Sequence, residues 1–192
     1  MASPRLAIFG DGANVDRASE EIGIKINYSR FRAFLAGNRV IASTNYYNSK
    51  SSDPGDQAFY SRLRTIGYTV ILGPKKVPGR SQKEVDVQIA VDLVSGAYTN
   101  LSDIALLASG DGDLAPAVRK LRSMNKTIEV ASFRKQFSMS LITSASRTID
   151  LTASTRQFQN QLGLAADGPS PSGRRKTPRH SGLPLNVTMP SC

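Results

Sequence analysis

The order of short apolar and amphipathic segments constrains the fold of this chain more than any other feature of its sequence. Apolar segments of strand length alternate with stretches whose apolar residues recur at helical spacing. The expected strands are 5–10, 39–46, 68–72, 103–108, 127–133 and 148–151, and the expected helices are 28–36, 57–66, 83–95, 114–123 and 138–145. This alternation predicts an α/β domain with a mostly parallel central sheet and helices on both faces.

The composition changes near residue 160 and divides the chain into two parts. Gly, Pro and Ser supply 12 of the 25 residues in 168–192, and a small basic cluster lies at 174–179. A segment of this composition buries too little apolar surface to order itself. We therefore expect a folded domain over residues 1–155 and a disordered basic tail over 156–192.

Several classes of protein are excluded by residue counts. The chain of 192 residues has one cysteine, Cys192, and one histidine, His180, so an internal disulfide framework, a Cys/His zinc cluster and His-based triad catalysis are excluded. No apolar run approaches the roughly 20 residues of a membrane span, and the N-terminus lacks the apolar core of a signal peptide. We therefore expect a soluble cytoplasmic protein that does not bind membranes.

The chain is strongly basic, which bears on its partner. The formal net charge is +10, and residues 1–160 alone still carry +7. A positive balance of this size favours a polyanionic partner, and nucleic acid before a membrane surface. The basic character therefore belongs to the expected domain as well as to the tail.

Acidic residues follow two of the apolar strands. Asp11 comes directly after the first strand, and Asp111 and Asp113 follow the strand at 103–108. Asp86 lies near the start of the helix at 83–95. Function in parallel sheets gathers at the carboxyl ends of the strands, so we expect these carboxylates to meet there. Oxygen-only clusters suit Mg²⁺ or Mn²⁺, which such carboxylates hold together with waters and substrate phosphates. The alternative is that the Asp-Gly pairs are only turn formers.

Two further residues near this cluster have alternative interpretations. Asp92 lies on the same helix as Asp86, but six residues place the two roughly 120° apart around the helix. Asp92 is therefore either a ligand or a surface charge. Asn14 is either a side chain that holds a water or a phosphate, or the N-cap of a helix. The glycines beside Asp11 and Asp111 are expected to leave room for a phosphate.

A basic loop follows the third strand and is the candidate nucleic-acid contact. Lys75, Lys76, Arg80 and Lys83 could bind a nucleic-acid backbone through its phosphates, without sequence specificity. The alternative is a solvated loop. Tyr46 and Tyr47, at the expected end of the second strand, could stack on bases or pack at the rim of the domain.

Three motifs in this order resemble the NYN domain, a LabA-like group within the PIN-like nuclease superfamily. They are FGDGAN at 9–14, KEVDV at 83–87 continuing to the acidic position 92, and SGDGDL at 109–114. The resemblance covers about residues 5–152. It implies a three-layer, Rossmann-like fold of the PIN type and an endoribonuclease site that uses Mg²⁺ or Mn²⁺. The site residues implied by position are Asp11, Asn14, Asp86, Asp92, Asp111 and Asp113.

The leading hypothesis is therefore a metal-dependent endoribonuclease that hydrolyses RNA phosphodiester bonds. The first alternative is a non-catalytic RNA-binding or regulatory module of the same fold. The second is a small-molecule phosphatase or nucleotidase. A homodimer is consistent with the resemblance, because PIN-like domains often pair, and a protein partner stays open.

Overall fold

The computed structural model describes residues 3–75 and 81–160, and its centre is a six-stranded sheet. The strands are β1 (Arg5–Asp11), β2 (Val40–Lys50), β3 (Thr69–Lys75), β4 (Ile104–Ala108), β5 (Thr127–Ser132) and β6 (Arg147–Asp150). They lie in the order β3-β2-β1-β4-β5-β6, and every neighbouring pair is parallel. The α/β prediction is confirmed, and the sheet is parallel throughout the described residues.

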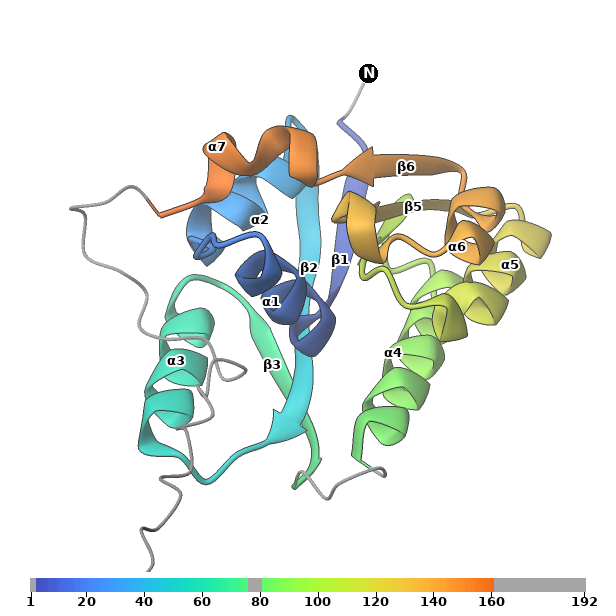
Figure 1. The fold of residues 1–192 in the computed structure, drawn as a ribbon. Coiled ribbons are helices and arrows are strands. Elements are labelled where there is room, and N and C mark those ends of the chain that lie inside the picture. Colours follow the sequence, from blue (N-terminus) through green and yellow to red (C-terminus); the bar gives the residue numbers. More distant parts are fainter. Residues whose placement is uncertain (1–2, 76–80, 161–192) are drawn as a thin grey trace, which may run out of the picture.

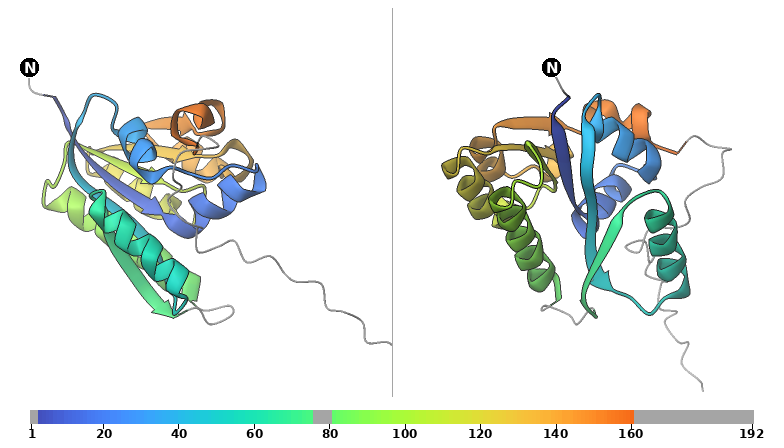
Figure 2. Two further views of the ribbon diagram at one scale, coloured as in Figure 1. Left: turned by 90° about the vertical axis from the view of Figure 1, so that its left-hand side faces the viewer. Right: turned by 180° about the vertical axis from the view of Figure 1, so that it is seen from behind.

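Helices cover both faces of this sheet and make a three-layer structure (Figures 1 and 2). They are α1 (Gly12–Glu21), α2 (Tyr28–Ala36), α3 (Pro54–Thr65), α4 (Ser81–Tyr98), α5 (Ala115–Ser123), α6 (Met139–Ser144) and α7 (Thr155–Phe158). Residues of α1, α2, α3 and α7 pack in one core cluster, and residues of α4, α5 and α6 pack in the other. In β1, β3, β4 and β5 the two clusters use alternate residues of the strand, as the pleat requires.

The two layers of core differ in chemistry. The cluster under α1, α2, α3 and α7 is rich in aromatic rings, including Tyr28, Phe31 and Tyr46, which meet mostly edge to face. The cluster under α4, α5 and α6 is mainly aliphatic, with Val85, Ile89 and others along one stripe of α4. Burial of both faces explains why the strands are apolar at consecutive positions instead of alternating.

Three differences from the predicted elements matter for the site. Helix α1 was not expected, because its sequence is polar and contains Gly and Asn, which have low helix propensity. Strand β2 continues to Lys50, so Tyr46 and Tyr47 lie inside the strand and not at its end. The packed part of the chain also extends past residue 155, because Phe158 is fully buried and Gln159 pairs with Ile26. The expected tail from residue 161 lies outside the described residues.

Candidate functional site

The strand order reverses between β1 and β4, so the segments that follow these two strands diverge to opposite faces of the sheet. A crevice at the carboxyl ends of the strands forms at such a point. Asp11 is the last residue of β1, and the segment Ser109–Asp113 follows β4 directly. The two acidic motifs found in the sequence therefore meet at this edge, as predicted.

Asp11 is the most buried of the predicted ligands, with 1% of its surface exposed. Its carboxylate caps helix α1 by accepting a hydrogen bond from the backbone N–H of Asn14 (3.1 Å), and it accepts another from the hydroxyl of Ser109 (3.0 Å). Burial raises the pKa of Asp11 to about 7; these two hydrogen bonds oppose the rise, and the charges of Asp86 and Asp111 add to it. The charges of Asp86 and Asp111 therefore reach Asp11 and disfavour its ionised form.

Asn14 joins the two halves of the site. Its side-chain carbonyl accepts a hydrogen bond from the backbone N–H of Gly110 (2.9 Å). The interpretation of Asn14 as an N-cap is wrong, because Asp11 occupies that position and Asn14 lies in the first turn of α1. Helix α1 thus holds the loop after β4 against the end of β1.

The loop after β4 presents Asp111 and Asp113 at the rim. Asp111 is half-buried, and its carboxylate accepts a hydrogen bond from the backbone N–H of Asp113 (3.0 Å). Asp113 itself is exposed. Ser109, fully buried, donates to Asp11 and accepts from the backbone N–H of Asp111 (3.1 Å). Sequence reasoning missed Ser109; the signal was its position directly after the apolar strand.

The two aspartates of α4 have different surroundings. Asp86 is half-buried, and its charge contributes to the raised pKa of Asp11. Asp92 accepts hydrogen bonds from the hydroxyl of Tyr47 (2.9 Å) and from the amide of Gln88 (2.8 Å). The structure therefore brings Asp86 to the Asp11 group and engages Asp92 in a separate set of contacts.

Base stacking, one of the two alternatives for Tyr46 and Tyr47, is wrong, because both rings pack inside the protein. Tyr46 and Tyr47 have 1% and 0% of their surface exposed, because β2 runs through the middle of the core. The hydroxyl of Tyr46 donates to Asp16 (2.8 Å) and that of Tyr47 to Asp92. Neither ring is accessible to a base.

The glycines of the two motifs make room for the protein's own chain. A Cβ on Gly12 would lie 2.2 Å from the ring of Tyr46, and one on Gly110 would lie 2.3 Å from the backbone carbonyl oxygen of Gln136. The expectation that these glycines leave space for a phosphate is therefore wrong at both positions. They permit close packing of the segments that carry Asp11 and Asp111.

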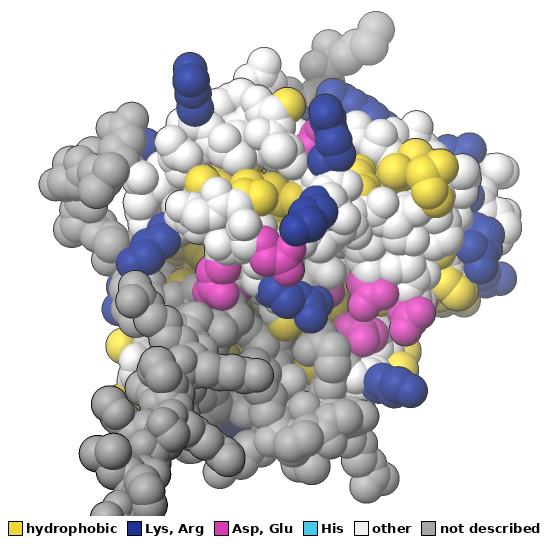
Figure 3. Space-filling model, in the orientation of Figure 1, with side chains coloured by type: hydrophobic (Ala, Val, Ile, Leu, Met, Phe, Trp, Pro, Cys, Tyr) yellow, Lys and Arg dark blue, Asp and Glu magenta, His cyan; other side chains and the backbone are white. Residues whose placement is uncertain are grey.

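The basic residues of the candidate nucleic-acid contact are described only in part. Lys83 is exposed near the start of α4, three residues before Asp86. Lys75 ends β3, while Lys76 and Arg80 lie outside the described residues. Figure 3 shows acidic side chains gathered across the middle of one face, with Lys and Arg side chains spread around them.

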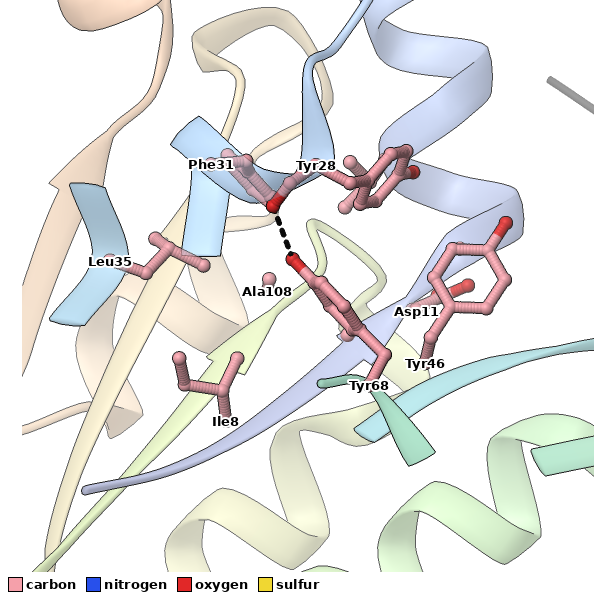
Figure 4. Close-up of a pocket in the computed structure, with 11 residues that line it drawn as sticks. Ile8, Asp11, Tyr28, Phe31, Leu35, Tyr46, Tyr68 and Ala108 are labelled. Carbon is pink, nitrogen blue, oxygen red and sulfur yellow. Dashed lines mark hydrogen bonds between the residues drawn. The ribbon is translucent and has the colours of Figure 1, made fainter. Parts of the chain in front are cut away.

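A pocket beside Asp11 belongs to the core. It lies between the sheet and helices α1 and α2, and Figure 4 shows the rings of Tyr28, Tyr46 and Tyr68 around it. The hydroxyl of Tyr68, the residue before β3, donates to the backbone carbonyl of Tyr28 (3.0 Å) at the start of α2. The lining is mainly aromatic and aliphatic, so this pocket offers no contacts for a phosphate.

The chemistry of the donor set fits a hard cation that keeps part of its water shell. Within residues 3–75 and 81–160, no three His, Cys, Asp or Glu side chains are close enough to hold one metal ion between them. Mg²⁺, however, is commonly bound through one or two carboxylates, with waters completing the shell. Burial is the main cause of the raised pKa of Asp11, and repulsion from Asp86 and Asp111 adds to it; a divalent cation relieves that repulsion.

Fold and site together define an α/β protein with an acidic group at the reversal of its strand order. The chain belongs to the NYN domain family, since the model of the NYN domain matches residues 5–152. This confirms the resemblance found in the three motifs. NYN domains form part of the PIN-like nuclease superfamily, whose members are generally nucleases and usually use divalent metals.

Two similar proteins support the assignment. The chain is 31% identical over 157 residues to the "Low amplitude and bright protein LabA" of Synechococcus elongatus, which covers 77% of this chain and 83% of that protein. It also resembles the crystal structure of a protein of unknown function from Vibrio parahaemolyticus, with a TM-score of 0.72 and 26% identity, covering 82% of this chain and 97% of the other. Among the described helices, none is long and apolar enough to cross a membrane.

Proposed function

We propose that this protein is an endoribonuclease that hydrolyses RNA phosphodiester bonds with the help of Mg²⁺ or Mn²⁺. The observation that carries the proposal is the buried carboxylate of Asp11, whose pKa is raised to about 7 by burial and by the nearby charges of Asp86 and Asp111. A buried carboxylate that is repelled by two further carboxylates at the strand-order reversal is costly without a cation. Membership of the NYN domain family supports the same conclusion.

Each residue of the group has a separate task in this proposal. One or two of the carboxylates of Asp11, Asp86 and Asp111 would hold the cation together with waters, and Asp113 would lie at the exposed rim where the substrate arrives. When bound, the cation lowers the pKa of a water molecule and stabilises charge on the attacked phosphoryl group. Asn14 positions Asp111 through its bond to Gly110. Asp92 is left out of the ligand set, because its carboxylate is engaged by Tyr47 and Gln88.

RNA is the proposed substrate because the protein is basic around an acidic site. A net charge of +10 attracts a polyanion, while contacts to the backbone phosphates do not select a sequence. Lys83 is the described member of the proposed basic contact, and its exposed side chain lies on the same helix as Asp86. The remaining members, Lys75, Lys76 and Arg80, complete the contact in this proposal.

Cleavage of a fluorescent single-stranded RNA tests the proposal. Wild type is compared with Asp111→Asn in Mn²⁺, in Mg²⁺ and in EDTA. The matched control is Asp103→Asn, because Asp103 lies at the opposite end of β4 and pairs with Arg5. We expect metal-dependent cleavage in wild type and in the control, and its loss in Asp111→Asn. Binding of RNA without cleavage in either metal would contradict the proposal and indicate an RNA-binding module.

A further inference from the structure

Two serine hydroxyls from a different strand connection stand beside the Asp111–Asp113 loop. Ser138 and Ser140 belong to the segment between β5 and the first turn of α6. A Cβ built on Gly112 would lie 2.7 Å from the Oγ of Ser138 and 3.0 Å from the Oγ of Ser140. Because Gly112 lies between the two aspartates in the sequence, both hydroxyls border the acidic rim of the site.

The segment that carries these serines is firmly attached to the loop. The backbone N–H of Ser138 donates to the carbonyl of Gly110 (3.1 Å). Gly110 also packs so tightly against the backbone of Gln136 that a side chain there has no space. On the other side, Leu141 is fully buried in the core under α6. The positions of the two hydroxyls are therefore fixed relative to Asp111.

Within the described residues, these hydroxyls contribute little to the fold. Their oxygens lie 2.8 Å apart, and either can be the donor. Ser138 occupies the N-cap position of α6, yet its side chain makes no capping bond. One hydroxyl donates to the other, so the pair retains one hydrogen that can be donated to a further acceptor.

We propose that the Ser138–Ser140 pair binds a backbone phosphate of the RNA strand next to the phosphate that is cleaved. This inference rests on the proposed ribonuclease function. A neutral hydroxyl donates to a non-bridging phosphate oxygen without competing with a cation for the carboxylates of Asp111 and Asp113. It also reads no base, so it positions the strand without selecting a sequence. The pair thus offers one uncharged donor at an otherwise acidic rim.

The test uses the full chain with Ser138 and Ser140 both changed to alanine. The matched control is Ser144→Ala, because this hydroxyl lies in the same helix but donates to the backbone carbonyl of Ser140 (2.6 Å). In cleavage of a single-stranded RNA, we expect the KM of the double variant to rise about three- to tenfold, while kcat stays within twofold of wild type. This is the pattern for a contact that binds the ground state and the transition state of the substrate equally. An unchanged KM, or a fall in kcat alone, would overturn the inference.

A binding measurement separates this inference from the proposed function. Fluorescence anisotropy with the same RNA is measured for both serine variants in the Asp111→Asn background. A three- to tenfold weaker affinity for the double variant, with Ser144→Ala unchanged, supports the phosphate contact even if wild type cleaves no RNA. If the double serine variant binds RNA as tightly as the Asp111→Asn parent, the phosphate contact is overturned. The proposed ribonuclease function is then judged separately, from cleavage by wild type. The absence of any RNA binding overturns both. Thermal unfolding of each variant checks that the fold is intact.

Discussion

Asp11, the N-cap of helix α1, and Asp16, in the middle of that helix, are equally buried, yet their surroundings differ. Each has 1% of its surface exposed. Asp16 accepts hydrogen bonds from the hydroxyls of Tyr28 and Tyr46, one on each carboxylate oxygen. Asp11 accepts from Asn14 and Ser109 and lies near two more carboxylates that raise its pKa.

The difference shows what distinguishes a structural carboxylate from a functional one. The partners of Asp16 are neutral donors from the aromatic core, which satisfy the buried carboxylate. Asp11, in contrast, lies near the negative charges of Asp86 and Asp111, so an ionised Asp11 needs a cation from outside the protein to balance its charge. Burial is the same for both residues and does not separate them; the sign of the neighbouring groups does.

Removal of Asp16 gives the largest expected change in stability. Asp16→Ala leaves the hydroxyls of Tyr28 and Tyr46 buried without their acceptor, at about 1–3 kcal/mol each, so we expect a loss of about 2–6 kcal/mol in the free energy of unfolding. At pH 4, where Asp11 carries little charge in the folded protein, Asp11→Asn keeps a good N-cap residue, so its free energy of unfolding stays within about 1 kcal/mol of wild type. Urea denaturation of both variants measures this. Equal losses of unfolding free energy in Asp16→Ala and Asp11→Asn would contradict the distinction between a structural and a functional aspartate.

The pH dependence of stability sharpens the same contrast. The pKa of Asp11 is raised from 3.8 to about 7 in the folded protein, so between these values the folded state holds a proton that the unfolded state has released. The free energy of unfolding therefore falls as pH rises from about 4 to 7, by about 4 kcal/mol from this group, and levels off above. Urea denaturation in EDTA across this range measures the fall. Asp11→Asn should remove it, and a variant curve parallel to wild type would contradict the assignment to Asp11.

Cation affinity should depend on Asp11 and not on Asp16. We expect Asp11→Asn to weaken Mn²⁺ binding by about 100-fold, or about 2.7 kcal/mol, since a carboxylate ligand is replaced by a neutral amide. Asp16→Asn keeps an oxygen acceptor for one tyrosine and should bind Mn²⁺ as wild type does. Isothermal titration calorimetry at pH 8, where Asp11 is ionised, gives both affinities. Weakened binding in Asp16→Asn alone would reverse the roles assigned here.

Most of the fold could be predicted because the strands are strongly apolar and regularly spaced. The runs at 5–10 and 103–108 became the two central strands β1 and β4. Helix α1 could not be predicted, since its residues 12–21 are mainly polar and its stability comes from contacts distant in sequence. The bond from Gly110 to Asn14 spans 96 residues and has no local signal.

The acidic residues of the site could be predicted from the sequence, but the hydrogen bonds that position them could not. Acidic residues at the ends of two strands pointed to Asp11 and Asp111, and the sheet topology explains why they meet. The sequence separated Asp86 from Asp92 by their positions around the helix but left the role of Asp92 open, because its partner Tyr47 comes from the distant strand β2. The tyrosines were misassigned because the length of β2 was underestimated, and a strand's ends carry weaker signals than its centre.

The smallest expected effect is the loss of a single hydrogen bond to Asp16. Tyr46→Phe removes one hydroxyl that donates to Asp16 and accepts from the amide of Asn48 (3.2 Å), but keeps the ring that packs against Gly12. Tyr28 still donates to Asp16, so we expect a loss of about 1 kcal/mol in the free energy of unfolding. The matched control is Tyr98→Phe, whose ring is 80% exposed and which should leave stability unchanged.

The same variant also tests whether the two aspartates act independently. If the tyrosines only satisfy Asp16, Tyr46→Phe should leave Mn²⁺ affinity and the rate of RNA cleavage at saturating substrate within twofold of wild type. A tenfold loss of either, in protein that is still fully folded at the assay temperature, would mean that the aromatic network controls the position of α1 and, through Asn14, the acidic rim. Asp16 and Asp11 would then be energetically coupled, because a change in a partner of Asp16 would alter cation binding or cleavage at the site of Asp11.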